Sequence, residues 1–156
     1  MGVEPILGHL PALRRYARLL TGDAARADDL VQDTVERACR KWALWQPGPT
    51  LRGWLLAIMH NLYANQRRDW RLDDGHADLD EVPEPAHEPF ALAGERLDLQ
   101  RALARLPLPM REVLLLVTVE EYSYAEAAEL LQVPIGTVMS RLHRARERLR
   151  ALLTEA

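Results

Sequence analysis

Two groups of polar side chains in this sequence could bind nucleic acid. Residues 133–150, VPIGTVMSRLHRARERLR, carry five arginines and one histidine among regularly spaced apolar residues. The second group lies in residues 54–70, where aromatic rings are interspersed with amide and basic side chains. Arginine can bond guanine or phosphate, and aromatic rings beside amides and cations suit single-stranded DNA. Both groups therefore favour nucleic-acid binding over catalysis.

The C-terminal group is predicted to be a helix-turn-helix. Residues 123–126, SYAE, fit a capping box that opens a short helix, residues 133–136 turn the chain, and Thr137 is expected to cap the last helix. The second helix of such a unit lies in the major groove, where its N-terminal residues reach base edges. The side chains expected to be exposed there are Met139, Ser140, Arg141, His143 and Arg144. An arginine-rich solvent face on the closing helix of a bundle is the alternative.

The group in residues 54–70 has two interpretations as well. A single-strand site needs a stacking surface, base-edge partners and phosphate-binding cations. The candidates are Trp54, His60, Asn61, Asn65, Gln66, Arg67 and Arg68. Trp54 and Tyr63 at helical spacing also suit a buried core. The neighbouring segment 28–41 has an acidic face, which is either solvated or a docking surface for a basic protein.

Catalytic and metal sites are not predicted. His76, Asp78, Asp80, His87 and Glu88 lie in a proline-containing acidic segment without the rigid spacing that metal ligands need. Cys39 is the only cysteine, has no nucleophile motif around it, and is expected to be a buried small residue. No glycine-rich phosphate loop is present. We expect no enzyme, no metal and no cofactor.

The elements that must position these groups are helices. Apolar residues recur at helical spacing in three stripes before residue 70 and in further stripes after residue 95, so the predicted fold class is all-α. The first stripes are Leu10, Leu13, Ala17 and Leu20; Val31, Val35, Ala38 and Trp42; and Leu55, Met59 and Tyr63 beside Trp54, Ile58 and Leu62. Asp23 and Thr50 are expected to cap the second and third helices.

Charge divides the 156-residue chain into three parts. The formal net charge of −3 arises from +3 in residues 1–70, −7 in residues 71–95 and +1 in residues 96–156. We predict a helical domain at 5–70, a flexible acidic linker at 71–95 and a helix-turn-helix domain at 96–156. No apolar run approaches the roughly 20 residues that cross a bilayer, and the N-terminus lacks a secretory pattern. A cytoplasmic location without membrane insertion is the expectation.

Both halves of the sequence resemble one family. The stretches DDLVQDTVERACRKW and LRGWLLAIMHNLYANQRRD resemble region two of bacterial RNA polymerase sigma factors. The stretch LARLPLPMREVLLLVTVEEYSYAEAAELLQVPIGTVMSRLHRARERL resembles their region four. The spacing of the two and the short linker resemble the extracytoplasmic-function (ECF) class. The resemblance implies a transcription initiation factor that binds core polymerase, recognises a two-part promoter and aids promoter melting.

The resemblance also implies roles for individual residues. The docking surface for the β′ clamp helices of core RNA polymerase would be Asp29, Gln32, Asp33 and Glu36. Residues 106–119 would include the surface facing the β flap. The minus-ten element of promoter DNA would be held as single strand by Trp54, His60, Asn61, Asn65, Arg67 and Arg68. The minus-thirty-five duplex would contact Thr137, Met139, Ser140, Arg141, His143 and Arg144. An anti-sigma factor is an implied partner.

Two departures from the family pattern affect the helix-turn-helix. Met139 stands where a basic residue is common, and Gln132 replaces a glycine that would tolerate positive φ. A free-standing helix-turn-helix regulator is the alternative function, since its DNA-binding unit would look the same. A protein that imitates a sigma factor and only binds other proteins is a third possibility.

Overall fold

The computed structural model describes residues 4–44, 50–74 and 95–154, and helices dominate these ranges. In chain order they contain α1 (Glu4–Gly8), α2 (Leu10–Thr21), α3 (Ala24–Arg40), the 3-10 turn η1 (Trp42–Leu44), α4 (Leu51–Asp74), α5 (Glu95–Ala104), α6 (Leu108–Thr118), α7 (Tyr124–Leu131) and α8 (Ile135–Thr154). Strands are absent from the described part of the chain. The all-α prediction is confirmed.

The first half is a bundle in which α3 packs against both α2 and α4. Asp23 begins α3 as predicted, because its carboxylate accepts from the amide of Ala25 at 2.9 Å. Thr50 does the same for α4, accepting from the amide of Gly53 at 3.1 Å. The predicted stripes face inward, with Leu13, Leu20, Ala38, Leu55 and Met59 among the core residues. The sequence did not predict α1, which adds the buried Ile6 to this core.

The second half consists of α5 to α8. The predicted capping box is present: the Ser123 hydroxyl accepts from the Glu126 amide at 3.0 Å, and Glu126 accepts from the Ser123 amide at 2.9 Å. These bonds start α7 and hold the pKa of Glu126 below its ordinary value. Gln132 ends α7 with φ 58°, the left-handed conformation for which the family pattern has glycine. Gln132 therefore keeps the turn geometry without changing the backbone.

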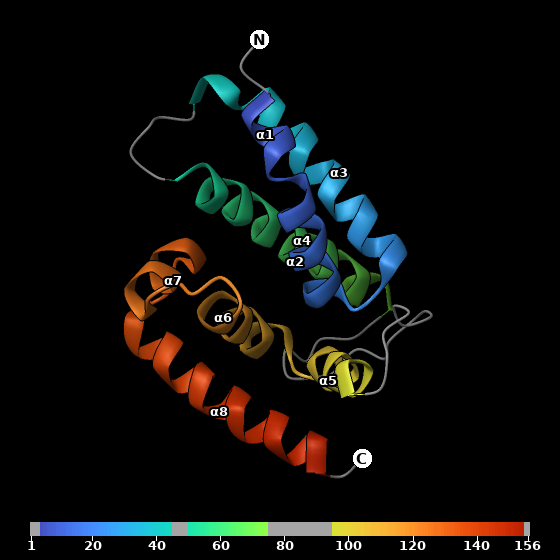
Figure 1. Cartoon of the computed structure of the whole chain (residues 1–156), viewed down its shortest axis with the longest axis vertical. Coiled ribbons are helices and arrows are strands. Elements are labelled where there is room, and N and C mark those ends of the chain that lie inside the picture. Colours follow the sequence, from blue (N-terminus) through green and yellow to red (C-terminus); the bar gives the residue numbers. More distant parts are fainter. Residues whose placement is uncertain (1–3, 45–49, 75–94, 155–156) are drawn as a thin grey trace.

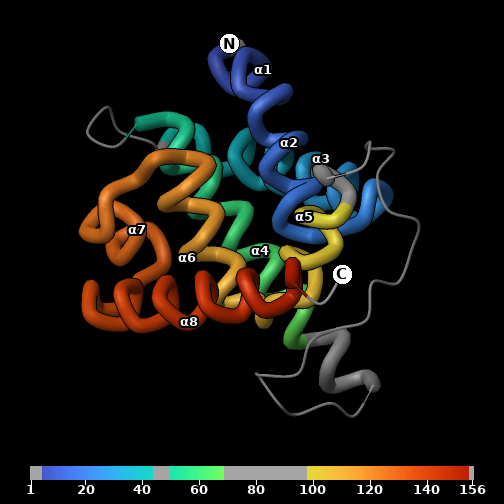
Figure 2. Tube along the Cα trace, turned by 60° about the horizontal axis from the view of Figure 1, so that its bottom comes forward, coloured from blue at the N-terminus to red at the C-terminus, as the bar shows by residue number. Residues whose placement is uncertain are grey.

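The two halves lie directly against each other (Figure 1). Contacts join α2 to α5 and α6, and α4 to α7, so one cluster of buried apolar side chains runs through both halves. Figure 2 shows α6 between the first half and the long α8. The sequence predicted a linker between two units but gave no sign of this shared core.

Helix α4 runs past residue 70 to Asp74, because neither glycine nor proline interrupts residues 54–74. Two local predictions were wrong. Cys39 is exposed, since its neighbour Ala38 takes the buried position and the next residue lies about 100° around the helix. Thr137 does not cap α8.

Helix α8 instead begins at Ile135, so Thr137 lies in its first turn and its amide donates to the carbonyl of Pro134 at 3.0 Å. Proline at this boundary loses nothing, because an amide there would have no partner within the helix. The five acidic and histidine residues considered as metal ligands lie in 75–94, outside the described residues. Within the described ranges no group of three such side chains suits a metal ion, and no helix has the length and apolar character to cross a membrane.

Candidate nucleic-acid interface

Helix α8 presents its basic side chains on the face opposite to the core. Val138, Leu142 and Ala145 are buried against the rest of the second half, as their spacing predicted. This fixes the rotation of the helix about its axis, so the residues between them point outward. Contacts join α8 to α6 and α7, which gives the helix-turn-helix a rigid support.

The six residues predicted to contact the minus-thirty-five duplex are therefore brought together on one surface. Met139, Ser140, His143 and Arg144 are exposed, and Thr137 and Arg141 are partly exposed. Met139 is 48% exposed, so its side chain could make only apolar contact with DNA, for example with a thymine methyl group. His143 lies 3.3 Å from Glu147, both on the solvent side of the helix.

The six residues predicted for the minus-ten strand are divided by the structure. Asn61, Asn65 and Arg68 are exposed on α4, and the Arg68 guanidinium bonds the side-chain oxygen of Asn65. Trp54 is partly buried and packs edge-on against Trp42, with ring centroids 6.3 Å apart. His60 and Arg67 are buried. In this arrangement the amide side chains and Arg68 are the candidates most open to DNA, Trp54 is partly covered, and His60 and Arg67 are covered.

His60 of α4 is buried and contacts polar groups from two other helices. Tyr16 of α2 lies with its hydroxyl 2.9 Å from Nε2, and Glu112 of α6 lies with a carboxylate oxygen 2.7 Å from Nδ1. Since an ionised carboxylate only accepts, Nδ1 donates to Glu112, and Nε2 is the ring nitrogen that faces the Tyr16 hydroxyl. Burial, followed by the negative charges of Glu112 and Glu120, raises the pKa of Tyr16 well above its ordinary value, so that the hydroxyl keeps its proton.

A second polar contact joins the halves at the start of α4. The Arg52 guanidinium donates to both carboxylate oxygens of Glu120, at 2.9 and 2.5 Å. The Glu120 side chain is only 3% exposed. Tyr122 lies beside this pair and bonds Thr50, and its pKa is raised first by burial and then by Glu120. The Arg52–Glu120 ion pair therefore places one positive and one negative side chain at the junction between the two halves.

Arg111 completes the junction from the side of α6. The side chain is 1% exposed, and its guanidinium donates to four backbone carbonyls. These carbonyls belong to Leu20 at the end of α2, to Leu103 and Ala104 at the end of α5, and to Leu106 just after α5. One cation thus caps two helix C-termini, where carbonyls lack partners within the helix. Burial lowers the pKa of Arg111 from its ordinary value.

The surface predicted to dock on polymerase is exposed along α3. Asp29, Gln32, Asp33 and Glu36 all face solvent. Asp33 accepts from Gln66 of α4 at 3.2 Å, which holds that carboxylate against the neighbouring helix. Glu36 pairs with Arg40 one turn along, at 2.6 Å. An exposed pair of this kind contributes little to stability, so both groups are available to a partner.

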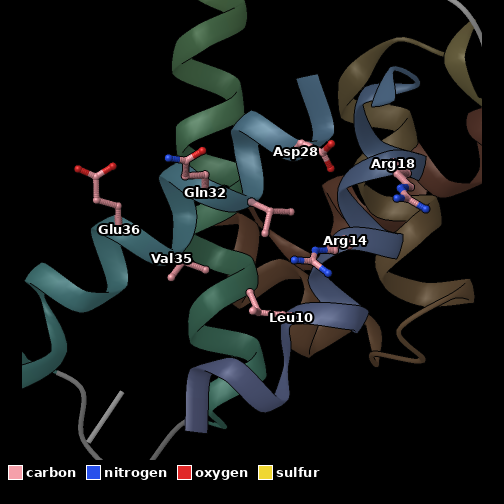
Figure 3. A pocket seen from close by; sticks show the side chains of 8 residues that line it. Leu10, Arg14, Arg18, Asp28, Gln32, Val35 and Glu36 are labelled. Atoms are coloured by element: carbon pink, nitrogen blue, oxygen red, sulfur yellow. The ribbon is translucent and has the colours of Figure 1, made fainter. Parts of the chain in front are cut away.

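A groove of about 710 Å³ runs beside this acidic surface, between α2 and α3 (Figure 3). Its apolar part is formed by Leu10, Val31 and Val35. Polar side chains from both helices surround that part: Arg14, Arg18, Asp28, Gln32 and Glu36. Arginines on one wall and carboxylates on the other suit an amphipathic helix that carries both charge signs. The sequence did not predict the groove, because it needs the relative placement of two helices.

The residues that sequence reasoning missed are those joining the halves. Arg111 and Glu112 directly precede an apolar run, which indicates that these two charged residues lie near the core. The sequence does not indicate which carbonyl groups or rings their side chains contact. Arg52 and Glu120 are 68 residues apart, and nothing in their surroundings predicts a pair.

This geometry defines the class of the protein. A helix-turn-helix with an outward basic face, supported by a second helical unit that exposes amide and arginine side chains, is typical of an all-helical DNA-binding protein. Comparison with known proteins narrows the class. Residues 6–60 match the family described as the Sigma2 domain of PhyR, and residues 96–149 match the family described as Sigma-70, region 4.

The chain is 39% identical over 151 residues to the ECF RNA polymerase sigma factor EcfG of Rhodopseudomonas palustris, covering 96% of this chain and 83% of that protein. It is 36% identical over 157 residues to the ECF RNA polymerase sigma factor SigL of Mycobacterium tuberculosis, covering 94% and 85%. The chain belongs to the ECF family of RNA polymerase sigma factors.

Solved structures are similar over both halves. The sigma factor RpoE in complex with the anti-sigma factor NepR from Bartonella quintana matches with TM-score 0.78 and 33% identity, over 97% of this chain and 95% of that chain. CnrH in complex with the cytosolic domain of CnrY matches with TM-score 0.68 and 27% identity, over 97% and 86%. The likeness therefore includes how the halves are placed, in addition to the fold of each.

Proposed function

We propose that this chain, as a sigma factor, directs core RNA polymerase to a promoter with two elements and helps to open the minus-ten element. The observation that carries the proposal is the exposed basic surface of α8, held in orientation by the buried Val138, Leu142 and Ala145, in a chain of this family. RNA synthesis belongs to the polymerase, so this function requires binding surfaces and no catalytic residue.

Three surfaces, on α3, α4 and α8, each bind a different partner. The acidic side of α3, around Asp29 and Glu36, binds core polymerase through a basic partner surface. Asn61, Asn65 and Arg68 on α4 contact the minus-ten strand through amide groups and one cation. The N-terminal half of α8 binds the minus-thirty-five duplex, where Arg141 and Arg144 contact guanine edges or phosphates.

An anti-sigma factor is part of the same proposal. Two proteins that resemble this chain along nearly its whole length were solved in complex with a second protein: RpoE with the anti-sigma factor NepR, and CnrH with the cytosolic domain of CnrY. The groove between α2 and α3 offers an apolar strip between walls of opposite charge. A helix of an anti-sigma factor in this groove would compete with polymerase, because Gln32 and Glu36 belong to both surfaces.

The experiment measures duplex binding by the chain alone and with core polymerase, using a promoter library. A sigma factor should bind weakly alone and selectively with polymerase, because the second half has a net charge of only +1 and neutralises few phosphates. Arg141→Ala with Arg144→Ala should reduce selective binding about tenfold or more, whereas Arg105→Ala, at an exposed position in the turn after α5, should not. Tight selective binding without polymerase would instead identify a free-standing regulator.

Docking on polymerase is tested separately. Asp29→Arg should weaken capture of the chain by core polymerase, whereas Asp98→Arg, a charge reversal at another exposed aspartate, on α5, should leave it unchanged. Equal capture of both variants would contradict the assignment of α3.

A sigma mimic is the second candidate function. The match of residues 6–60 to the Sigma2 domain of PhyR favours it, and a structure of the PhyRSL–NepR complex from Sphingomonas sp. Fr1 resembles this chain at 26% identity with TM-score 0.67. A mimic would bind the anti-sigma factor but direct no transcription start, so a transcription assay separates the two functions.

A further inference from the structure

The exposed side of α8 has two flanks of different chemistry. The buried stripe of the helix fixes its rotation, and successive residues turn by about 100°. Ile135 and Met139 therefore share one flank, one turn apart, whereas Arg141 and Arg144 lie on the other. Figures 1 and 2 show α8 along the outer edge of the second half. Both flanks are thus presented to a partner outside the chain.

The apolar flank consists of two large side chains that the core does not use. Ile135 is 45% exposed and Met139 is 48% exposed. Neither belongs to the cluster of buried and partly buried apolar residues that holds α8 in place. Single exposed apolar residues are ordinary on a protein surface, but an adjacent pair forms a patch that gains free energy when a partner covers it.

Small residues form the middle of the exposed side, between the two flanks. A Cβ atom added to Gly136 would meet nothing within 4 Å, and the φ of this glycine is not positive. Glycine in a helix is less stable than alanine, so neither packing nor backbone conformation within the chain requires it here. Ser140 follows one turn later, and its hydroxyl donates to the carbonyl of Thr137 at 3.2 Å. Another molecule can therefore approach this side of the helix closely.

Charge on the second flank identifies that molecule as duplex DNA. Arg141 and Arg144 suit phosphates or guanine edges, and α8 has no acidic residue before Glu147 that would repel a phosphate. The major groove admits a helix, and the C5 methyl group of thymine is the apolar group that its base edges present. A helix that enters the groove with its small residues innermost brings one flank to each side, so the apolar pair meets base edges.

We propose that Ile135 and Met139 form a methyl-reading site, which packs against the C5 methyl group of a pyrimidine in the minus-thirty-five duplex and selects a methyl-bearing base there. The proposal rests on the proposed function, which gives α8 this duplex as its target, and it names the chemical feature that the helix selects. Thymine carries the methyl group, and so does 5-methylcytosine. The two sources share one chemistry and are separated by experiment.

Deoxyuridine provides the perturbation on the DNA side, because it pairs as thymine does but lacks the C5 methyl group. The probe is a duplex that core polymerase with the wild-type chain selects from the promoter library. Each thymine of its minus-thirty-five element is replaced in turn, and binding by the same complex is measured. Burial of one methyl group changes affinity about fourfold, so deoxyuridine should weaken binding by about that factor at one or two positions.

Met139→Ala provides the matching perturbation on the protein side. It should weaken binding to the thymine duplex about fourfold and should no longer respond to deoxyuridine at the sensitive position, because the two changes remove the same contact. Leu153→Ala is the matched control: Leu153 is 39% exposed and lies on the same flank of α8, about five turns further along. It should change neither the affinity nor the response to deoxyuridine.

Two further variants give results that a loss of packing within the chain would not produce. Met139→Lys should abolish the response to deoxyuridine and increase the salt dependence of binding by about one counterion. Gly136→Ala should leave the urea midpoint of the free chain unchanged or raise it, because the added Cβ meets nothing in the chain, but it should weaken duplex binding. Wild-type duplex affinity for Gly136→Ala would show that this side of α8 does not face DNA and would overturn the proposal.

Replacement of each cytosine in the same element by 5-methylcytosine separates the two sources of the methyl group. Weaker binding to deoxyuridine duplexes assigns the site to thymine. Tighter binding to 5-methylcytosine, without any effect of deoxyuridine, assigns it to methylated cytosine. Indifference of the wild type to both changes, or an unaltered response in Met139→Ala, would refute the methyl-reading site.

Failure of this site is distinguishable from failure of the proposed function. Selective binding with core polymerase that ignores the methyl group would retain the function and refute the site. Methyl-dependent selection of a duplex by the chain alone would retain the site and identify a free-standing regulator. If Met139→Ala weakens capture by core polymerase in the absence of DNA and leaves the response to deoxyuridine unaltered, the apolar pair is a protein contact and the proposal is overturned.

Discussion

Replacement of Arg111 by methionine should destabilise the protein strongly, although no DNA or polymerase contact is involved. Methionine fills most of the same space but cannot donate. The change leaves the carbonyls at the ends of α2 and α5 without a donor in a site where the arginine was 1% exposed. Hydrogen bonds to a charged group contribute about 1.5–3 kcal/mol each, and four are lost.

The desolvation of the buried guanidinium offsets part of that sum, so the net loss should be about 3–5 kcal/mol, the usual cost of removing one partner from a buried charged site. Arg111→Lys keeps the charge with fewer donors in a different geometry, and should lose about half as much. Urea unfolding followed by circular dichroism gives these values. Arg105→Met, an exposed change near the end of α5, should cost less than about 0.5 kcal/mol. A loss below about 1 kcal/mol for Arg111→Met would refute the capping role.

Three further outcomes are expected. Ser123→Ala should cost about 1 kcal/mol by removing the cap of α7. The capping box lowers the pKa of Glu126 in the folded protein. The stability that the Glu126 carboxylate contributes is therefore present above the ordinary glutamate pKa and is lost as the pH falls through the pKa of the folded protein. Urea unfolding should accordingly show a smaller effect of Ser123→Ala in acid than near neutrality. Gln132→Gly should raise the unfolding free energy by about 0.5–1 kcal/mol in the same assay, since φ 58° strains a residue with a side chain. A destabilised variant would show that the hydrogen bond from the Gln132 side chain to the Glu129 carbonyl contributes more than the strain costs. Arg144→Ala should lower the salt dependence of promoter binding by about one counterion if that arginine meets phosphate, and an unchanged slope would assign it to a base.

Helices with a strong local signal were predictable from sequence. Ser123 and Glu126 formed the expected box, Asp23 and Thr50 capped the expected helices, and Val138, Leu142 and Ala145 were buried as their spacing required. These features depend on neighbours within a few positions in the chain. The turn at Gln132 keeps the left-handed backbone of a helix-turn-helix, although the replacement of glycine there had indicated a tightened or re-aimed turn.

Features that depend on distant residues could not be predicted. The burial of His60 requires Tyr16 and Glu112, which lie 44 and 52 residues away in sequence, and no periodicity reports such a meeting. Thr137 was misplaced as a cap because proline at residue 134 can begin a helix as well as interrupt one. Cys39 was assigned to the buried face of its helix, although it is exposed, because helical periodicity does not show how far the buried face extends around the helix.

The assigned roles of the DNA surfaces stay predictions, and their arrangement sharpens them. All six minus-thirty-five candidates share one face of α8, so single substitutions there should have related effects. The minus-ten candidates fall into an exposed set and a covered set. Substitution of Asn61 or Asn65 should therefore affect strand binding directly, whereas substitution of His60 also disturbs the junction between the halves.

Run-off transcription with purified core polymerase tests the central claim most directly. Core polymerase with this chain should produce transcripts from defined starts on a promoter library, and Arg141→Ala with Arg144→Ala should abolish or redirect those starts. Arg105→Ala should support the same starts as the wild type. If the chain directs no specific start while a control sigma factor succeeds in the same assay, it is not an initiation factor, and the account given for its surfaces fails.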